Sequence, residues 1–221
     1  MMPGLIFLFV AVFIVIAVVG AHMAGQRRKV VRTWAQGKGW RFSQDKDHDL
    51  HERHDFDCLQ RGRSRYAYNI CQGQWDDLPV RAFDYHYTTG SGKNRTDHNF
   101  SAVILGTLVP LKRMLIRPEG VFDKLTAFFG LDDIDFESAE FSRRFFVKAD
   151  DRRWAYDVIH QRTMDFLLSS PQYSIAFDRD CVIAWRDRRL QPEQFDEAME
   201  LVKGILDRLP DYLIQQQRQE A

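Results

Sequence analysis

Three residues whose types could together carry out nucleophilic catalysis, Asp84, His86 and Ser101, lie in two neighbouring predicted strands. In a serine hydrolase, the serine hydroxyl bonds to a histidine, an acid orients that histidine, and nearby donors stabilise the oxyanion. The glycines of a nucleophile elbow are missing around Ser101. We therefore keep the three as candidate catalytic residues, while ordinary cross-strand polar pairing is the interpretation that the sequence favours.

The geometry of this group depends on residues 79–87 pairing with residues 98–107 as a β-hairpin. Matching the aromatic faces of the two segments sets the expected register. One face of the hairpin should then carry Phe83, Tyr85, Tyr87, His98, Phe100 and Ala102. The opposite face should carry Asp84, His86, Asn99 and Ser101.

The loop of that hairpin, residues 89–93, has the sequence Thr-Gly-Ser-Gly-Lys and superficially resembles a nucleotide-binding loop. A P-loop requires a first glycine where this chain has Tyr87, and a hydroxyl residue where it has Asn94. It also joins a strand to a helix, whereas this loop joins two strands. The segment is predicted to be a hairpin loop.

Three histidines, His48, His51 and His54, lie among carboxylates in residues 47–55 and are the candidate metal ligands of the chain. His51 and His54 are three positions apart and could share a helical face. Lys46 and Arg53 intervene, and a solvated charged connector explains the same composition. We expect no metal and no cofactor.

The N-terminus predicts a membrane-spanning helix over residues 1–25. Every residue from Leu5 to Val19 is apolar, and the stretch continues to Gly25 past the single His22. About 20 mostly apolar residues are needed to cross the hydrocarbon core. The alternative, a cleaved signal peptide, has a shorter apolar region preceded by basic residues, and only a poor cleavage pattern follows this run.

Four basic residues that follow the apolar run directly are predicted to lie at the membrane surface: Arg27, Arg28, Lys29 and Arg32. Positive residues beside a span remain on the cytoplasmic side. We therefore expect a single-pass protein of the cell membrane, with its N-terminus outside and its C-terminal domain in the cytoplasm. Helical spacing of apolar residues over 26–40 predicts that the helix continues, or bends into a short amphipathic helix.

Composition limits the class of the remaining chain. The 31 Lys and Arg balance the 31 Asp and Glu, which argues against a general nucleic-acid binder. Seventeen Phe, seven Tyr and five Trp can supply a packed core. The three cysteines have no disulfide or zinc spacing, and are expected to be free thiols.

Residues 41–214 are predicted to form one soluble α+β domain with a largely antiparallel sheet, followed by a polar tail over 215–221. The predicted strands cover residues 65–72, 79–87, 98–107, 111–117, 140–149, 173–177 and 181–186. Helices are predicted over residues 119–129, from 150 or 151 to about 170, and from Pro192 to Pro210. In the last helix an apolar stripe, which includes Phe195, Val202 and Leu206, predicts a core-facing side.

Residues 83–148 resemble a group of uncharacterised bacterial proteins, each with an N-terminal span and one soluble domain. The resemblance is carried by the segments 83–87 (FDYHY), 89–93 (TGSGK), 117–119 (RPE), 133–138 (DIDFES) and 141–142 (FS). It implies a membrane-anchored architecture. It implies no activity and no catalytic residues.

These features predict a membrane-anchored cytoplasmic interaction or accessory domain without enzymatic activity. Its expected partners are the lipid bilayer and another membrane or cytoplasmic protein, and not nucleic acid. One alternative is a membrane-anchored enzyme, a hydrolase using Asp84, His86 and Ser101. Another is a sensor of small ligands or lipid headgroups that uses an aromatic pocket and the basic juxtamembrane residues.

Overall fold

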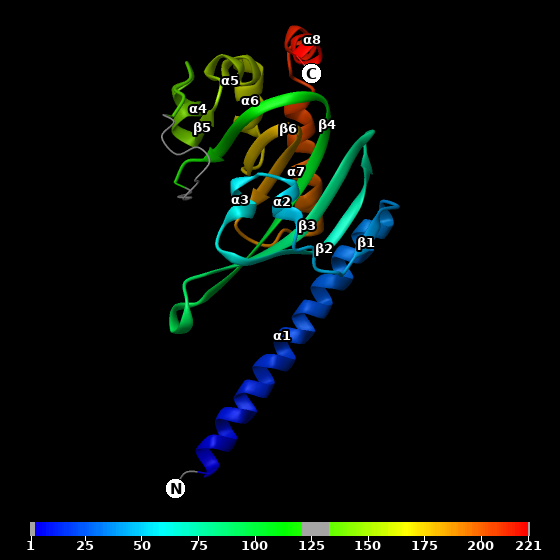
Figure 1. Ribbon diagram of the computed structural model, residues 1–221, viewed down its shortest axis with the longest axis vertical. Helices are drawn as coiled ribbons and strands as arrows, with labels where there is room; N and C mark the ends of the chain where they lie inside the picture. Colours follow the sequence, from blue (N-terminus) through cyan, green and yellow to red (C-terminus); the bar gives the residue numbers. More distant parts are fainter. Residues whose placement is uncertain (1–2, 121–132, 221) are drawn as a thin grey trace.

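A computed structural model of the chain describes residues 3–120 and 133–220 (Figure 1). The helix predicted over 119–129 lies outside this part, apart from its first two residues, which form a turn.

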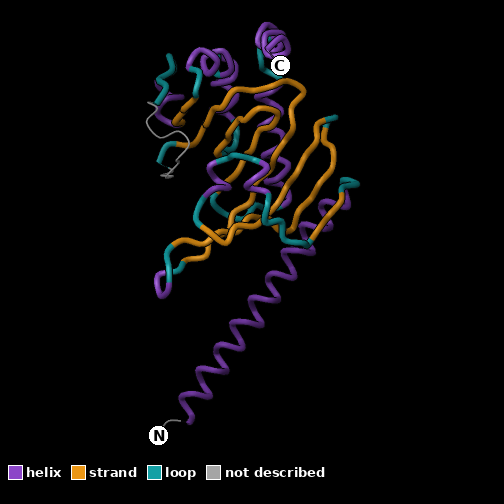
Figure 2. Tube along the Cα trace, viewed as in Figure 1, coloured by secondary structure: helices purple, strands orange, loops and turns teal. Residues whose placement is uncertain are grey.

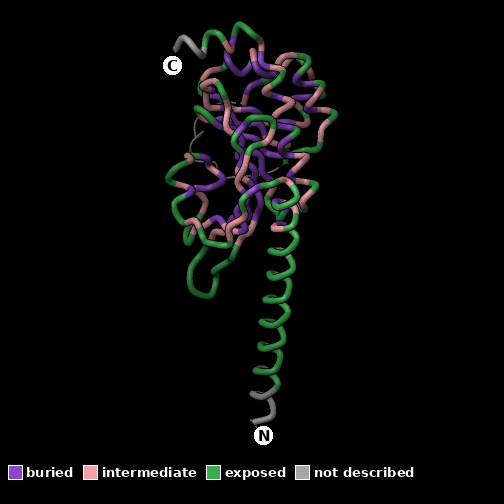
Figure 3. The backbone as a smooth tube through the Cα atoms, turned by 90° about the vertical axis from the view of Figure 1, so that its right-hand side faces the viewer, coloured by how far each residue is buried: buried purple, intermediate pink, exposed green. Residues whose placement is uncertain are grey.

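Helix α1, Pro3–Gly37, is one continuous helix of 35 residues. The apolar segment and the predicted juxtamembrane helix are therefore a single element. Within the described residues, one segment, Val10–Gly37, is long and apolar enough to cross a membrane, and its apolar window is not buried against the domain. Figure 3 shows this exposed part of α1 projecting away from a buried core. Since a core helix would be covered, α1 has the length, composition and exposure of a single membrane anchor.

The domain is built on one antiparallel sheet of six strands, ordered β1-β2-β3-β4-β5, with β6 also pairing with β4. The strands are β1 Arg41–Ser43, β2 Arg63–Trp75, β3 Leu78–Thr89, β4 Thr96–Pro118, β5 Phe145–Ala149 and β6 Ser174–Arg186. One edge of β4 pairs first with β3 and then with β5, while its other edge pairs with β6. The α+β class with a largely antiparallel sheet is confirmed.

Two pairs of predicted strands are each one long strand. Residues 98–107 and 111–117 both belong to β4, which has a register shift between Gly106 and Leu111 where it pairs with β6. Residues 173–177 and 181–186 largely form β6, and Arg179 between them has a φ of +47°. In both cases turn-like residues sit in an irregularity of the ladder instead of ending the strand.

The helices also differ from the prediction. They are α2 Leu50–Arg53, α3 Asp57–Gln60, α4 Ala139–Arg144, α5 Arg152–Val158, α6 Gln161–Ser169, α7 Pro192–Leu206 and α8 Asp211–Glu220, with a 3-10 turn η1 at Gly92–Asn94. The strand predicted over 140–149 is wrong in its first half, because the Ser138 hydroxyl accepts from the Phe141 amide and caps α4. The helix predicted from 150 to 170 breaks at Ile159, and the predicted tail over 215–221 belongs largely to α8.

Helices cover both faces of the sheet (Figure 2). Residues of α5, α6 and α7 pack on one face together with Val31 and Ala35 of α1. Residues of α2 and α3 pack on the other face. In α7 the predicted stripe is a core face, with Phe195 and Val202 fully buried, although Leu206 at its end is only partly buried.

Candidate functional site

The end of the apolar segment of α1 enters the domain through a buried ion pair. The Arg27 guanidinium donates from Nη2 to Asp84 Oδ1 at 2.8 Å and from Nε to Asp84 Oδ2 at 3.1 Å. The side chains of Arg27 and Asp84 are 10% and 0% exposed. Two parallel charge-assisted bonds give this contact a defined geometry as well as strength.

Asp84 is held from the domain side as well. Its Oδ2 accepts from Asn69 Nδ2 at 2.9 Å, and its Oδ1 accepts from the Ser101 hydroxyl at 2.5 Å. The Ser101 oxygen in turn accepts from the Leu190 amide at 3.0 Å. The carboxylate thus has partners from α1, β2 and β4, which offset the cost of burying its charge.

Further contacts extend this attachment along one face of α1. Val31 and Ala35 are buried, and the Trp34 ring stacks on Phe195 of α7 at 5.1 Å. Asp196 of α7 accepts from Trp34 Nε1 at 3.2 Å and pairs with Lys38 Nζ at 2.8 Å. We call the set Arg27, Val31, Trp34, Ala35 and Lys38 the anchor junction. Its spacing of three or four residues is that of one helical face.

The turn after α1 is fixed by Trp40. Its indole Nε1 donates to the Gln74 carbonyl at 3.0 Å. A Cβ on Gly73 would lie 2.2 Å from Trp40 Cδ1, so only glycine lets the ring approach strand β2 this closely. Helix α1 is therefore tied to the sheet at Arg27, and the turn that follows the helix is tied to it at Trp40.

The predicted β-hairpin register is the observed one. Phe83 pairs with Ala102, Tyr85 with Phe100, and Asp84 with Ser101. The structure brings Asp84 and Ser101 into contact, as the shared face implies.

His86 has different neighbours from Ser101. Its ring stacks on Tyr66 at 4.7 Å, and its Nε2 lies 3.8 Å from Asp97 Oδ1. Asp84 and Ser101 are both fully buried, and their polar atoms face Arg27, Asn69 and the Leu190 amide instead of a cavity. This arrangement is a structural polar network that joins α1 to the sheet.

The three candidate metal ligands are spread over the connector between β1 and α3. The His48 ring lies 5.4 Å from that of Tyr66, and His54 Nδ1 lies 3.6 Å from Cys181 Sγ. Within residues 3–120 and 133–220, no group of three or more His, Cys, Asp or Glu side chains is arranged to hold a metal ion.

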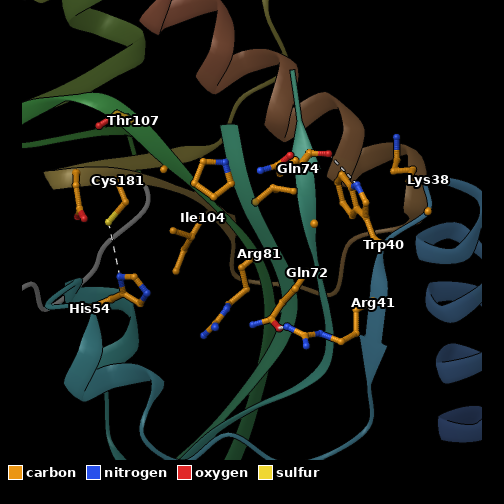
Figure 4. Close-up of a pocket in the computed structure, with 16 residues that line it drawn as sticks. Lys38, Trp40, Arg41, His54, Gln72, Gln74, Arg81, Ile104, Thr107 and Cys181 are labelled. Atoms are coloured by element: carbon orange, nitrogen blue, oxygen red, sulfur yellow. Dashed lines mark hydrogen bonds between the residues drawn. The ribbon is translucent and has the colours of Figure 1, made fainter. Parts of the chain in front are cut away.

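A wide groove of about 1000 Å³ opens at the end of the sheet near Trp40 (Figure 4). Its walls carry the cations Lys38, Arg41 and Arg81 together with the His54–Cys181 pair. Burial, with help from Asp180 and Asp178, raises the pKa of the Cys181 thiol to about 12.

A catalytic thiol needs a lowered pKa, so that it is a thiolate at neutral pH. Burial and the nearby Arg81 and Arg53 also lower the pKa of His54. Both members of the pair are thus neutral at neutral pH. The groove is lined by the cations of its walls together with apolar side chains such as Trp40 and Ile104. No local sequence pattern marks it, because its residues come from separate segments.

The four basic residues expected at the membrane surface divide into two kinds. Arg28 and Lys29 are exposed. Arg27 departs from the expectation, because its side chain is turned into the domain, and Arg32 is half-buried with its guanidinium 5.1 Å from the Phe42 ring. The sequence alone does not distinguish these positions, since all four are basic and follow the same apolar run.

Comparison with known proteins yields a fold relationship. No protein-family model and no curated sequence matches the chain. Among solved structures, the chain is similar to the crystal structure of the mycobacterial trehalose monomycolate transport factor A, TtfA, with a TM-score of 0.64 and 15% sequence identity. The similarity covers 83% of this chain and 96% of that chain. At this identity the likeness establishes a common fold, and α1 adds the features of a single-pass membrane protein.

Proposed function

We propose that this protein is a membrane-anchored accessory protein, without enzymatic activity, whose domain binds a second membrane protein. The observation that carries the proposal is the anchor junction. A flexible linker would be enough to concentrate a domain at the bilayer. A buried ion pair and a packed helix face instead hold the domain at one height and orientation, which is useful when the partner is itself fixed in the membrane.

The fold likeness supports the class of role. TtfA is named as a transport factor for trehalose monomycolate. We carry over the general role alone, an accessory protein of a membrane transport assembly, because 15% identity transfers neither substrate nor partner.

Orientation is part of the proposal. Arg28 and Lys29 are exposed directly after the apolar segment, and such residues favour a cytoplasmic domain. A reporter enzyme that is active only outside the cytoplasm, fused after Ala221, should be silent. Strong activity from this fusion would show that the domain lies outside the cytoplasm, and would contradict the proposed orientation.

The hydrolase alternative requires His86 beside Ser101, whereas Ser101 bonds to Asp84 and the Leu190 amide. The sensor alternative has one observation in its favour, the groove beside Trp40 with Arg41 and Arg81 in its wall. An anionic small ligand would suit those two guanidinium groups.

Photo-crosslinking in membranes tests the accessory role. A photoreactive amino acid would replace Leu108, Tyr156 or Tyr212, which are exposed large side chains of the domain. At one or more positions we expect an adduct with one membrane protein, and this adduct should weaken in Arg27→Ala and persist in the matched variant Arg28→Ala. Absence of adducts at all positions, or an adduct that Arg27→Ala leaves unchanged, would contradict the proposal.

A further inference from the structure

The hairpin formed by β3 and β4 extends past the rest of the sheet. Strand β2 accompanies β3 as far as Thr88, and β6 accompanies β4 from Ser101 onwards. Beyond these positions lies what we call the hairpin tip, residues 89–96. Figures 1 and 3 both show the tip hanging below the body of the domain, on the side where the exposed part of α1 projects.

Contacts between α1 and the sheet also show that the hairpin extends in the same general direction as the apolar part of α1. Trp40 touches Gly73, which pairs with Val80 of β3, and thirteen positions earlier Arg27 touches Asp84, farther along β3. Following α1 towards its N-terminus therefore follows β3 towards the tip. In this direction α1 continues into its apolar segment, and β3 continues to Thr89.

The reach of the hairpin can be compared with the membrane boundary. From Asp84 to Thr89 a strand advances about 17 Å, at about 3.3 Å per residue. From Arg27 to Gly25, where the apolar run ends, a helix advances only about 3 Å. If only half of this advance lies along the axis of α1, the tip descends about 8 Å, past the level of Gly25 to about that of His22. The hairpin is therefore long enough to reach the lipid headgroups.

The chemistry of the tip suits headgroups and not the hydrocarbon core. Residues 88–97 contain no aliphatic or aromatic side chain larger than threonine. Lys93 and Arg95 are exposed there, and Asp97 pairs with Arg95 at 3.1 Å. Arg63, also exposed, donates to the Gly90 carbonyl at the neck of the tip. Cations next to hydroxyl and glycine backbone groups bind phosphate oxygens.

The tip is also held in place. Gly90 has a φ of +70°, and a Cβ there would lie 2.1 Å from the Asn94 carbonyl oxygen. His98 stacks on Tyr87 at 4.6 Å and bonds to Thr89 Oγ1 at 2.8 Å. The Arg27–Asp84 pair fixes the root of the same hairpin, so the anchor determines the height of the tip above the bilayer.

We propose that the hairpin tip binds the headgroups of anionic phospholipids, through Lys93 and Arg95 with Arg63 beside them. This proposal rests on α1 being the membrane anchor. Each basic residue near an anionic surface favours the bound state roughly fivefold. The contact gives the domain a second point of attachment to the bilayer, and this limits the tilt of α1 and the domain together relative to the membrane plane.

Fluorescence in lipid nanodiscs tests this contact with the full chain. A fluorophore would be attached at Ser91→Cys in the tip or, as a control, at Arg153→Cys in α5, which Figure 1 shows on the far end of the domain. The discs would contain phosphatidylcholine alone or with phosphatidylglycerol, and a headgroup-linked quencher. We expect quenching at position 91 to exceed that at 153, to increase with phosphatidylglycerol, and to fall severalfold in Lys93→Gln/Arg95→Gln.

Charge-matched variants separate the tip from a general charge effect. Arg152→Gln/Arg162→Gln removes the same charge from exposed positions of α5 and α6, and should leave the quenching at position 91 unchanged. Quenching at 91 that equals that at 153, or that does not depend on phosphatidylglycerol, would overturn the tip proposal alone. Failure of the chain to enter the discs would instead contradict the anchor, and the tip proposal with it.

Discussion

Arg27 in the anchor helix and Asp84 in the third strand form a doubly hydrogen-bonded ion pair across 57 positions of sequence, with Nη2 and Oδ1 2.8 Å apart. Both side chains are buried, so each charge depends on the other for compensation. The pair thus joins the exposed apolar helix α1 to the folded domain, and fixes their relative placement.

Removing either partner should destabilise the domain strongly. Arg27→Ala or Asp84→Ala leaves an unpaired buried charge, which costs about 3–5 kcal/mol of unfolding free energy. The double variant should cost less than the sum, by about 1–3 kcal/mol. Denaturant unfolding of the detergent-solubilised chain measures all three, with Arg28→Ala as an exposed control that changes little. Strict additivity of the two single substitutions would show that the pair has no coupling.

Ser101 and His86 should differ in their effect on stability. Ser101→Ala leaves the Leu190 amide and one Asp84 bond without a partner, at a cost of about 1–3 kcal/mol. His86→Ala removes mainly a stacking contact with Tyr66, at a cost of about 1 kcal/mol. Complementation of a deletion strain, normalised to protein level, should succeed with both variants. Failure of both at normal abundance would favour the hydrolase alternative.

Two neighbouring residues of α7, Ile205 and Leu206, should differ in how much they contribute to the free energy of unfolding. Ile205 is 1% exposed, and Ile205→Ala should cost about 2–5 kcal/mol through lost burial and a cavity. Leu206 is only partly buried, so Leu206→Ala should cost less than half as much. Urea unfolding compares the two. An equal or greater loss from Leu206→Ala would mean that α7 is rotated relative to the described packing.

The thiols should be inert in the folded protein. Burial raises the pKa of both Cys71 and Cys181 to about 12, and Cys58 is fully buried. At pH 8 a thiol of ordinary pKa is about one quarter thiolate, whereas one of pKa 12 is about 10⁻⁴ thiolate. Iodoacetamide should therefore modify the native chain at least 100-fold more slowly than the unfolded chain. Rapid alkylation of Cys181 in the native state would indicate a reactive thiol beside His54.

Parts of this structure follow from sequence reasoning, and the reasons differ by element. The register of β3 and β4 was predictable because aromatic residues alternate with polar ones over both segments, and a slip by one residue would place aromatic residues opposite polar ones. The anchor and the core face of α7 were predictable from their unbroken apolar patterns.

Other parts needed the three-dimensional arrangement. A basic residue after an apolar run looks the same whether it faces lipid headgroups, as Arg28 can, or an acid in a distant strand, as Arg27 does. The groove beside Trp40 and Cys181 combines residues from separate elements, so no local pattern marks it. The sequence of α4 predicts a strand, because the Ser138 cap is a single weak signal before an alternating segment.

The most direct test of the account asks whether α1 and the domain move as one body. Spin labels at Val19→Cys in the exposed apolar part of α1 and at Arg162→Cys in α6 would report their separation by double electron–electron resonance in nanodiscs. We predict one narrow distance distribution for the otherwise unchanged chain and for Arg28→Ala, and a broad one for Asp84→Ala. A broad distribution without further substitution, or a narrow one that survives Asp84→Ala, would contradict rigid attachment through the Arg27–Asp84 pair.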